Sequence, residues 1–126
     1  MPLPSDPIRW EQKIDPGDRL DFLMELGAGT PPILDVDNGE IVTSYTLTMS
    51  AEGVALGLTI GTGLYAPQLI DSGRTVLLWL EVDSGNWSNA QYSGSGSEIG
   101  VTLQFQTNNS PARRYERTWA LKVLQR

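Results

Sequence analysis

Hydrophobic and polar residues alternate along most of this chain, and this two-residue period is the feature that most constrains its fold. In residues 53–60, for example, Val54, Leu56, Leu58 and Ile60 alternate with small or polar residues. Such a pattern predicts strands with one buried face, whereas an amphipathic helix would repeat every 3.6 residues. Alternation bounded by turn residues predicts six strands, over residues 19–26, 40–50, 53–60, 74–82, 99–107 and 115–124.

Two shorter segments, residues 8–14 and 64–70, are candidate edge strands. With seven or eight strands and no helical segment between them, the chain is predicted to be all-β, an immunoglobulin-like antiparallel β-sandwich. Residues 50–53 are predicted to make a short hairpin connection. The length of 126 residues suits one domain, so we expect a single sandwich over residues 15–126 and an extended, proline-rich N-terminal arm over residues 1–14.

The arm carries three prolines, and among its apolar residues Ile8 and Trp10 are the candidate anchors. A sandwich already supplied with strands has no obvious place for these two side chains, so the hypothesis is that they pack on a neighbouring subunit. Deletion of residues 1–12 should then weaken assembly and leave the melting temperature nearly unchanged. A further apolar contact is expected from Leu77 and Trp79, which lie on the outward face of their strand.

The segment 83–97 is a long polar connection rich in Ser, Asn and Gly, with Trp87 and Tyr92 within it. Two interpretations stay open. The segment is either a flexible tip with one aromatic ring folded back on the domain, or a contact loop of the composition that binding loops favour. Both aromatic residues are therefore candidate interface residues.

A net charge of −6 argues against general nucleic-acid binding, which requires a basic surface. The last fourteen residues nevertheless carry five of the nine Lys and Arg. Arg113, Arg114 and Arg117 are candidate polar contacts, either to an acidic partner or to the acidic body of the chain itself. The longest apolar run, residues 76–80, is far shorter than a membrane span, and no signal peptide is expected.

The chain contains no cysteine and no histidine, which excludes thiolate and imidazole chemistry. Asp15, Asp18 and Asp21 cluster in the sequence. The first two are typical of a β-turn and the third of the solvent-exposed face of a strand, so an enzyme with catalytic carboxylates ranks last among the function classes considered. Residues 35–40 depart from a calcium-loop template because Gly39 comes one position early, and a solvated turn is favoured. We expect no enzymatic activity, no metal and no cofactor.

Three segments in order resemble motifs of the fiber-tail adaptors, a family of tailed-phage proteins. Residues 13–22 (KIDPGDRLDF) resemble its opening, a Lys-Asp-Pro followed by an apolar position and an Asp-Tyr or Asp-Phe pair. Residues 38–48 (NGEIVTSYTLT) resemble its turn into a Thr-rich strand, and residues 113–123 (RRYERTWALKV) its closing strand. The chain departs from the family by an inserted isoleucine after Lys13 and by a longer 83–97 connection.

This resemblance implies a non-enzymatic virion protein with an immunoglobulin-like fold, made in the cytoplasm of a bacterial host. It would be an adaptor at the tail or neck that forms a homo-oligomer and contacts fibers or other tail, neck or capsid subunits. A capsid decoration (cement) protein is an alternative within this class. A carbohydrate-binding module is an alternative from another class, with Trp87, Tyr92 and Tyr65 stacking on a sugar and Trp10 and Trp79 as further platform residues.

Overall fold

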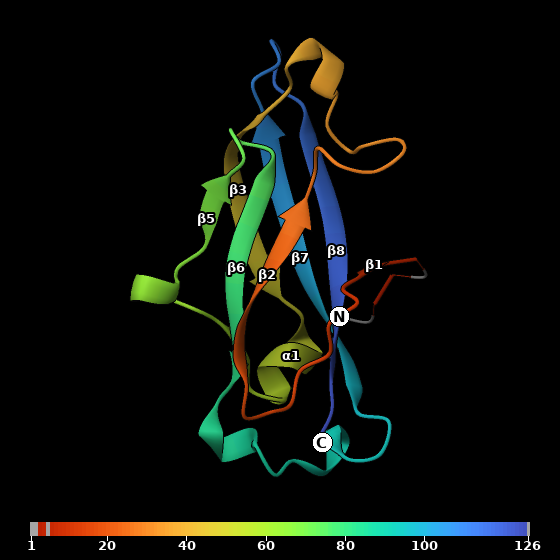
Figure 1. The fold of residues 1–126 in the computed structure, drawn as a ribbon, viewed down its shortest axis with the longest axis vertical. Coiled ribbons are helices and arrows are strands. Elements are labelled where there is room, and N and C mark those ends of the chain that lie inside the picture. The colour runs from red at the N-terminus through yellow and green to blue at the C-terminus, as the bar shows by residue number, and fades with distance from the viewer. Residues whose placement is uncertain (1–2, 5, 126) are drawn as a thin grey trace.

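The structure, a computed structural model, describes residues 3–4 and 6–125 and shows an all-β sandwich of two sheets (Figure 1). Sheet A has the order β1 (Ile8–Arg9), β8 (Arg114–Val123), β7 (Ser97–Thr107) and β3 (Val42–Met49). Sheet B has the order β2 (Arg19–Glu25), β6 (Thr75–Val82) and β4 (Leu58–Ile60), and β5 (Gln68–Ile70) also pairs with β6. The helical turns are α1 (Ala51–Ala55), η1 (Val36–Asn38), η2 (Gly63–Tyr65), η3 (Ser84–Asn86) and η4 (Ala90–Tyr92).

The strand arrangement is that of an immunoglobulin-like domain. β3, β7 and β8 share one sheet as strands C, F and G of that fold do, and β2, β6 and β4 share the other as strands B, E and D do. All strand pairs are antiparallel except β1–β8, which is parallel. The predicted fold class is therefore confirmed.

The alternating apolar residues form one core between the two sheets. β6 and β7 have a neighbouring strand on both sides and the opposite sheet against one face, so their inward residues are almost fully buried. These residues are Val76, Leu78, Leu80, Val82, Ile99, Val101, Leu103 and Phe105.

The predicted strand at 53–60 and the predicted hairpin connection at 50–53 are wrong. The chain forms α1 over Ala51–Ala55, and only Leu58–Ile60 is a strand. β3 and β4 belong to different sheets, so the chain must cross the end of the sandwich between them. Ser50 begins the helix as a cap, because its side-chain oxygen accepts a hydrogen bond from the Gly53 amide at 3.1 Å.

Trp10 packs on its own sandwich, which corrects the hypothesis that it lies on a neighbouring subunit, whereas Ile8 pairs with β8 and is 37% exposed. The Trp10 ring lies 5.0 Å from the Phe22 ring and 6.5 Å from the Trp119 ring, measured between centroids. Its Nε1 donates a hydrogen bond to the Leu23 carbonyl at 2.8 Å. The indole fills the open side of the sandwich between β2 and β8. The number of predicted strands did not indicate that this space exists.

A boundary between arm and domain at residue 14 is not present in the structure either. Ile14 is fully buried in the core, and its amide donates to the Lys122 carbonyl at 3.1 Å. Ile8 and Arg9 pair with β8, and the rest of the predicted 8–14 edge strand continues only as a hydrogen bond from the Trp10 amide to the Ala120 carbonyl and an isolated bridge at Ile14. Residues 8–14 are therefore part of the folded domain.

The 83–97 segment folds across one end of the sandwich. Tyr92 is fully buried, and its hydroxyl donates to the Leu56 carbonyl at 2.6 Å. The Gln125 amide donates to the Tyr92 carbonyl at 2.7 Å, which ties the segment to the C-terminal strand. The interpretation with one aromatic ring folded back describes Tyr92, and the prediction that Tyr92 is an interface residue is wrong.

Burial of Tyr92 predicts a loss of stability at high pH. Burial, with smaller effects from Asp83 and Glu52, raises the pKa of Tyr92 from 10.0 to about 12. The folded state holds the phenol proton more tightly than the unfolded chain, so this stabilisation is present below pH 10 and is lost as the pH rises through 12. A shift of this size corresponds to about 2–3 kcal/mol.

We expect the free energy of unfolding in urea to fall by about 2–3 kcal/mol more between pH 9 and 12 in the wild type than in Tyr92→Phe. The variant starts lower by about 1 kcal/mol, because it lacks the hydrogen bond to Leu56. All other titrating groups are common to both proteins, so the difference in slope reports Tyr92. Equal slopes would show that the phenol titrates as it does in the unfolded chain.

Candidate functional site

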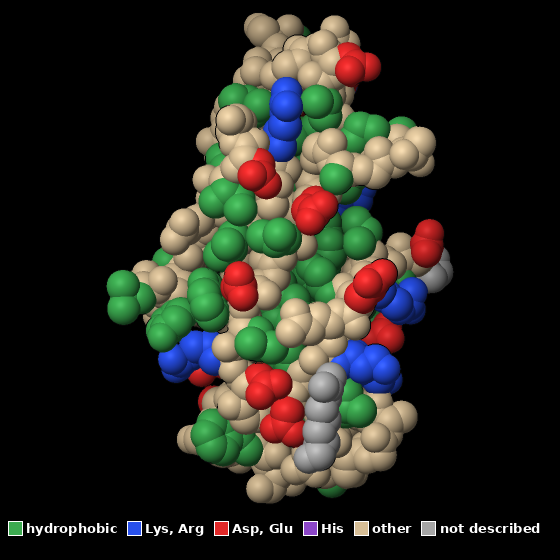
Figure 2. Space-filling model, viewed as in Figure 1, with side chains coloured by type: hydrophobic (Ala, Val, Ile, Leu, Met, Phe, Trp, Pro, Cys, Tyr) green, Lys and Arg blue, Asp and Glu red, His purple; other side chains and the backbone are tan. Residues whose placement is uncertain are grey.

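The outward face of sheet B carries an apolar stripe, defined here as Leu23, Leu77, Trp79 and Tyr65. Leu23 lies directly opposite Leu77 in the β2–β6 pair, and 39% of its surface is exposed. Trp79 packs edge-on against Tyr65 with ring centroids 5.1 Å apart. Figure 2 faces sheet B and shows hydrophobic side chains gathered over β2 and β6 with acidic ones among them. The predicted outward position of Leu77 and Trp79 is confirmed.

Charged groups border the stripe. The Arg19 guanidinium lies 4.4 Å from the centroid of the Tyr65 ring, and its Nε is 3.0 Å from a carboxylate oxygen of Glu81. The hydrogen bond to Glu81 raises the pKa of Arg19, so this group remains a cation. Asp21 lies opposite Trp79 in the β2–β6 pair. An apolar centre with a charged rim is the composition of a protein-binding surface.

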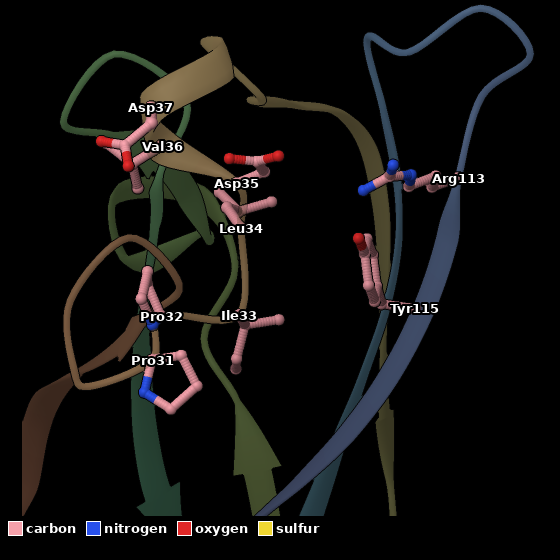
Figure 3. A pocket seen from close by; sticks show the side chains of 9 residues that line it. All are labelled: Pro31, Pro32, Ile33, Leu34, Asp35, Val36, Asp37, Arg113 and Tyr115. Carbon is pink, nitrogen blue, oxygen red and sulfur yellow. The ribbon is translucent and has the colours of Figure 1, made fainter.

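A cleft of about 400 Å³ opens at one end of the sandwich, between residues 31–37 and the start of β8 (Figure 3). Arg113 and Tyr115 form one wall, and Ile33 and Asp35 face them from the other side. The remaining lining residues are Pro31, Pro32, Leu34, Val36 and Asp37.

Glu40 lies behind this cleft, and its carboxylate is fully buried. It accepts a hydrogen bond from the Asp35 amide at 2.8 Å and longer ones from the Tyr115 hydroxyl at 3.4 Å, and Arg113 Nη1 lies 3.9 Å away. A buried carboxylate requires such partners. Glu40 is not among the predicted site residues, because the register shift between Val42 and Ser44 breaks the alternation that connects it to the rest of β3.

The three candidate arginines differ in their surroundings. Hydrogen bonding to Tyr115, and then the charge of Glu40, raise the pKa of Arg113. Arg117 lies over the Tyr115 ring at 5.7 Å from its centroid. Arg113, Arg114 and Arg117 are all exposed, so Arg113 turns toward the acidic body of the chain while the whole group stays accessible to a partner.

The aromatic residues proposed as a sugar platform are not brought together. Tyr92 is buried, whereas Trp87 is 47% exposed and donates from Nε1 to the Val82 carbonyl at 2.8 Å. Tyr65 instead pairs with Trp79, at an interplanar angle of 70° that gives no common flat surface. A stacking site made of Trp87, Tyr92 and Tyr65 therefore does not exist in this fold.

The acidic residues take the structural places expected for them. The Asp18 amide donates to the Asp15 carbonyl at 2.9 Å, which closes the predicted β-turn, and Asp21 lies on the outward face of β2. Gly39 adopts a positive φ of 72° at the end of η1, as a turn residue does. Among the described residues, no three His, Cys, Asp or Glu side chains group as metal ligands.

No described helix has the length and hydropathy that crossing a membrane requires. Comparison with known proteins gives no match to a family model, to a curated protein or to a solved structure. The resemblance to fiber-tail adaptors therefore rests on the three sequence segments alone.

Proposed function

We propose that this protein is a non-enzymatic structural component of a tailed-phage virion, an adaptor at the tail or neck that binds fibers or neighbouring tail proteins. The apolar stripe on sheet B is the observation that carries the binding role. The resemblance of residues 13–22, 38–48 and 113–123 to fiber-tail adaptors supports the place in the virion.

The stripe supports binding because the outward face of an antiparallel sheet is ordinarily polar. Here large apolar side chains of two paired strands lie next to one another, with Trp79 and Tyr65 as the aromatic members. Aromatic residues at the centre of a contact and charged residues at its rim are typical of protein interfaces. Leu64, which precedes Tyr65 and is 90% exposed, adds a further apolar group on η2.

Copy number in the virion tests this proposal and separates it from the cement alternative. Purified virions of a phage that encodes this chain would be analysed by quantitative peptide mass spectrometry against a major capsid protein. A dozen or fewer copies per particle is the expected result for an adaptor. Hundreds of copies would indicate a capsid decoration protein, and the absence of the chain from intact particles would overturn the virion assignment.

Replacement of Leu77 by arginine tests the stripe itself. Because the side chain points outward and is only half-buried, we expect the melting temperature to change little. Incorporation into virions should fall at least tenfold, since a charge would be buried without a partner in the contact. Thr59→Arg is the matched control, on the same outward face but in β4, outside the stripe. Equal incorporation of both variants would show that the stripe makes no contact.

A further inference from the structure

Most strand edges of this sandwich are covered, charged or short. The chain itself covers the outer edge of the second half of β8, where the amides of Trp10 and Ile14 donate to the carbonyls of Ala120 and Lys122. The first half of β8, residues 114–117, carries three charged side chains. The Trp10 indole meets the free edge of β2 at Leu23, and three of the seven residues of this edge strand are charged. β4 and β5 have three residues each, and short edge strands resist pairing with other chains. β3 differs from all of these, because it is an eight-residue edge strand of sheet A.

The alternation of hydrogen-bonded pairs between β3 and β7 shows which backbone groups of β3 point away from the sheet. The Ser50 amide donates to the Gly100 carbonyl at 3.1 Å, one position beyond the Met49–Val101 pair. Along an antiparallel strand pair, residue pairs that exchange backbone hydrogen bonds alternate with pairs that do not. The backbone groups of Thr48 and Thr46 therefore bond to β7, and those of Met49, Leu47 and Tyr45 point away from β7, toward the free edge.

The hydrogen bonds between β7 and β8 lead to the same assignment. The Thr107 amide donates to the Arg113 carbonyl at 3.0 Å, so Phe105, two residues earlier, is bonded to β8 and not to Tyr45. Among the described residues, no backbone hydrogen bond from a loop or turn reaches residues 43–49, and only Val42 is covered, by the Gly73 carbonyl at 2.8 Å.

The sequence of this edge lacks the usual protection against strand pairing. Residues 41–51 (IVTSYTLTMSA) contain no charged residue and no proline, although the chain as a whole carries a net charge of −6. Natural edge strands are usually protected by lysine, proline or inward-pointing charges. The one irregularity is a register shift between Val42 and Ser44, which leaves the segment from Ser44 onward regular.

We propose that β3 is a self-association edge, at which two copies of this chain pair antiparallel about a two-fold axis through Leu47. In this register Leu47 faces Leu47 of the second copy, and Tyr45 faces Met49 in both directions. Each of the three residues then uses its free amide and carbonyl, which gives six symmetric hydrogen bonds between the copies. Sheet A becomes one eight-stranded sheet across the dimer.

The side chains are self-complementary in this register. Tyr45, Leu47 and Met49 share the face of Phe105, Leu103 and Val101, so the pairs across the axis are Leu–Leu and Tyr–Met, both favourable contacts. On the opposite face, Thr46 lies across from Thr48 of the second copy. Because the strand is uncharged, two copies meet without local repulsion, whereas a charged partner segment would find no complementary group on it.

This inference does not depend on the apolar stripe, which lies on the other sheet, or on a place in a virion. Charge-swap variants at Thr46 and Thr48 test it, because both side chains are exposed and their backbone groups already bond to β7. In Thr46→Lys/Thr48→Lys, each new lysine faces a lysine of the second copy. In Thr46→Glu/Thr48→Glu, each glutamate faces a glutamate.

Sedimentation equilibrium and native mass spectrometry of the full-length proteins would measure association. We expect each double variant to raise the dissociation constant of the dimer by about tenfold or more, and a one-to-one mixture to form the mixed dimer in preference to either parent. The control Ser88→Lys/Gln91→Lys carries the same added charge on exposed positions of the 83–97 segment and should associate as the wild type does.

Each contrary outcome overturns the proposal. A monomeric wild type at millimolar concentration would show that β3 does not self-associate, even if the edge captured an added extended peptide. Equal weakening in the control would show that net charge, not the edge, sets association. Failure of the two folded variants to form the mixed dimer, with folding verified by circular dichroism and thermal melting, would exclude the register centred on Leu47.

Discussion

Trp10→Ala should lower the free energy of unfolding by about 3 kcal/mol. The variant loses the packing of the indole on Phe22 and Trp119 and the hydrogen bond to the Leu23 carbonyl. Removal of a buried tryptophan costs about 3–5 kcal/mol, and Trp10 is partly exposed, which places the expected value at the lower end. Urea unfolding followed by far-UV circular dichroism measures this without relying on tryptophan emission.

Ile8→Ala is the matched control in the same segment, since Ile8 is 37% exposed on a two-residue strand. We expect a loss below about 1 kcal/mol for this variant. Deletion of residues 1–12 should lower the melting temperature by at least as much as Trp10→Ala does. If both substitutions cost the same small amount, the indole does not close the side of the sandwich in solution, and the hypothesis of an arm on a neighbouring subunit would be restored.

Gly96→Ala should have an effect of similar or larger size, about 3 kcal/mol or more. Gly96 has a φ of +75°, and a Cβ there would overlap the Val123 carbonyl oxygen and approach Leu124 Cβ to 2.5 Å. The positive φ alone costs an L-residue about 1–2 kcal/mol, and the collision with the backbone adds to it because the C-terminal strand cannot move without breaking its ladder. Thermal melting and urea unfolding both measure the loss.

Gly94→Ala is the control for the backbone conformation. Gly94 also has a positive φ, of +64°, but a Cβ there would have nothing within 4 Å. We expect a cost of about 1 kcal/mol, from the left-handed conformation alone. If Gly94→Ala and Gly96→Ala cost the same, the 83–97 segment does not rest against the C-terminal strand, and Tyr92 would be free to take part in a contact.

The strands were predictable from the sequence because alternation is a local property. Val76, Leu78 and Leu80 fix the inward face of β6 by their spacing alone, and the outward position of Leu77 and Trp79 follows from the same phase. The helix α1 was not predictable in this way. Val54 within the helix and Leu56 directly after it have the spacing of a strand, and the helix forms where the chain changes sheets between β3 and β4.

The remaining features depend on contacts between segments far apart in the chain. Trp10 packs where it does only because β2 and β8 leave one side of the sandwich open. Glu40 accepts hydrogen bonds from Asp35 and from Tyr115, and Tyr115 is 75 residues further along the chain. The open edge of β3 depends on the order of strands in sheet A, which no local pattern specifies. The sequence therefore predicts Leu77 and Trp79 of the stripe, but not Leu23 or Tyr65 beside them, nor the cleft, nor the open edge.

The mass of the purified protein in solution, measured by light scattering over a range of concentrations at low and high salt, most directly tests whether this chain is an assembly protein. A mass of twice 13.8 kDa, or a larger even multiple, is expected. It should persist at high salt, because the β3 edge is uncharged and salt screens the repulsion between two chains of net charge −6. A mass of 13.8 kDa at every concentration and both salts would contradict self-assembly through the β3 edge.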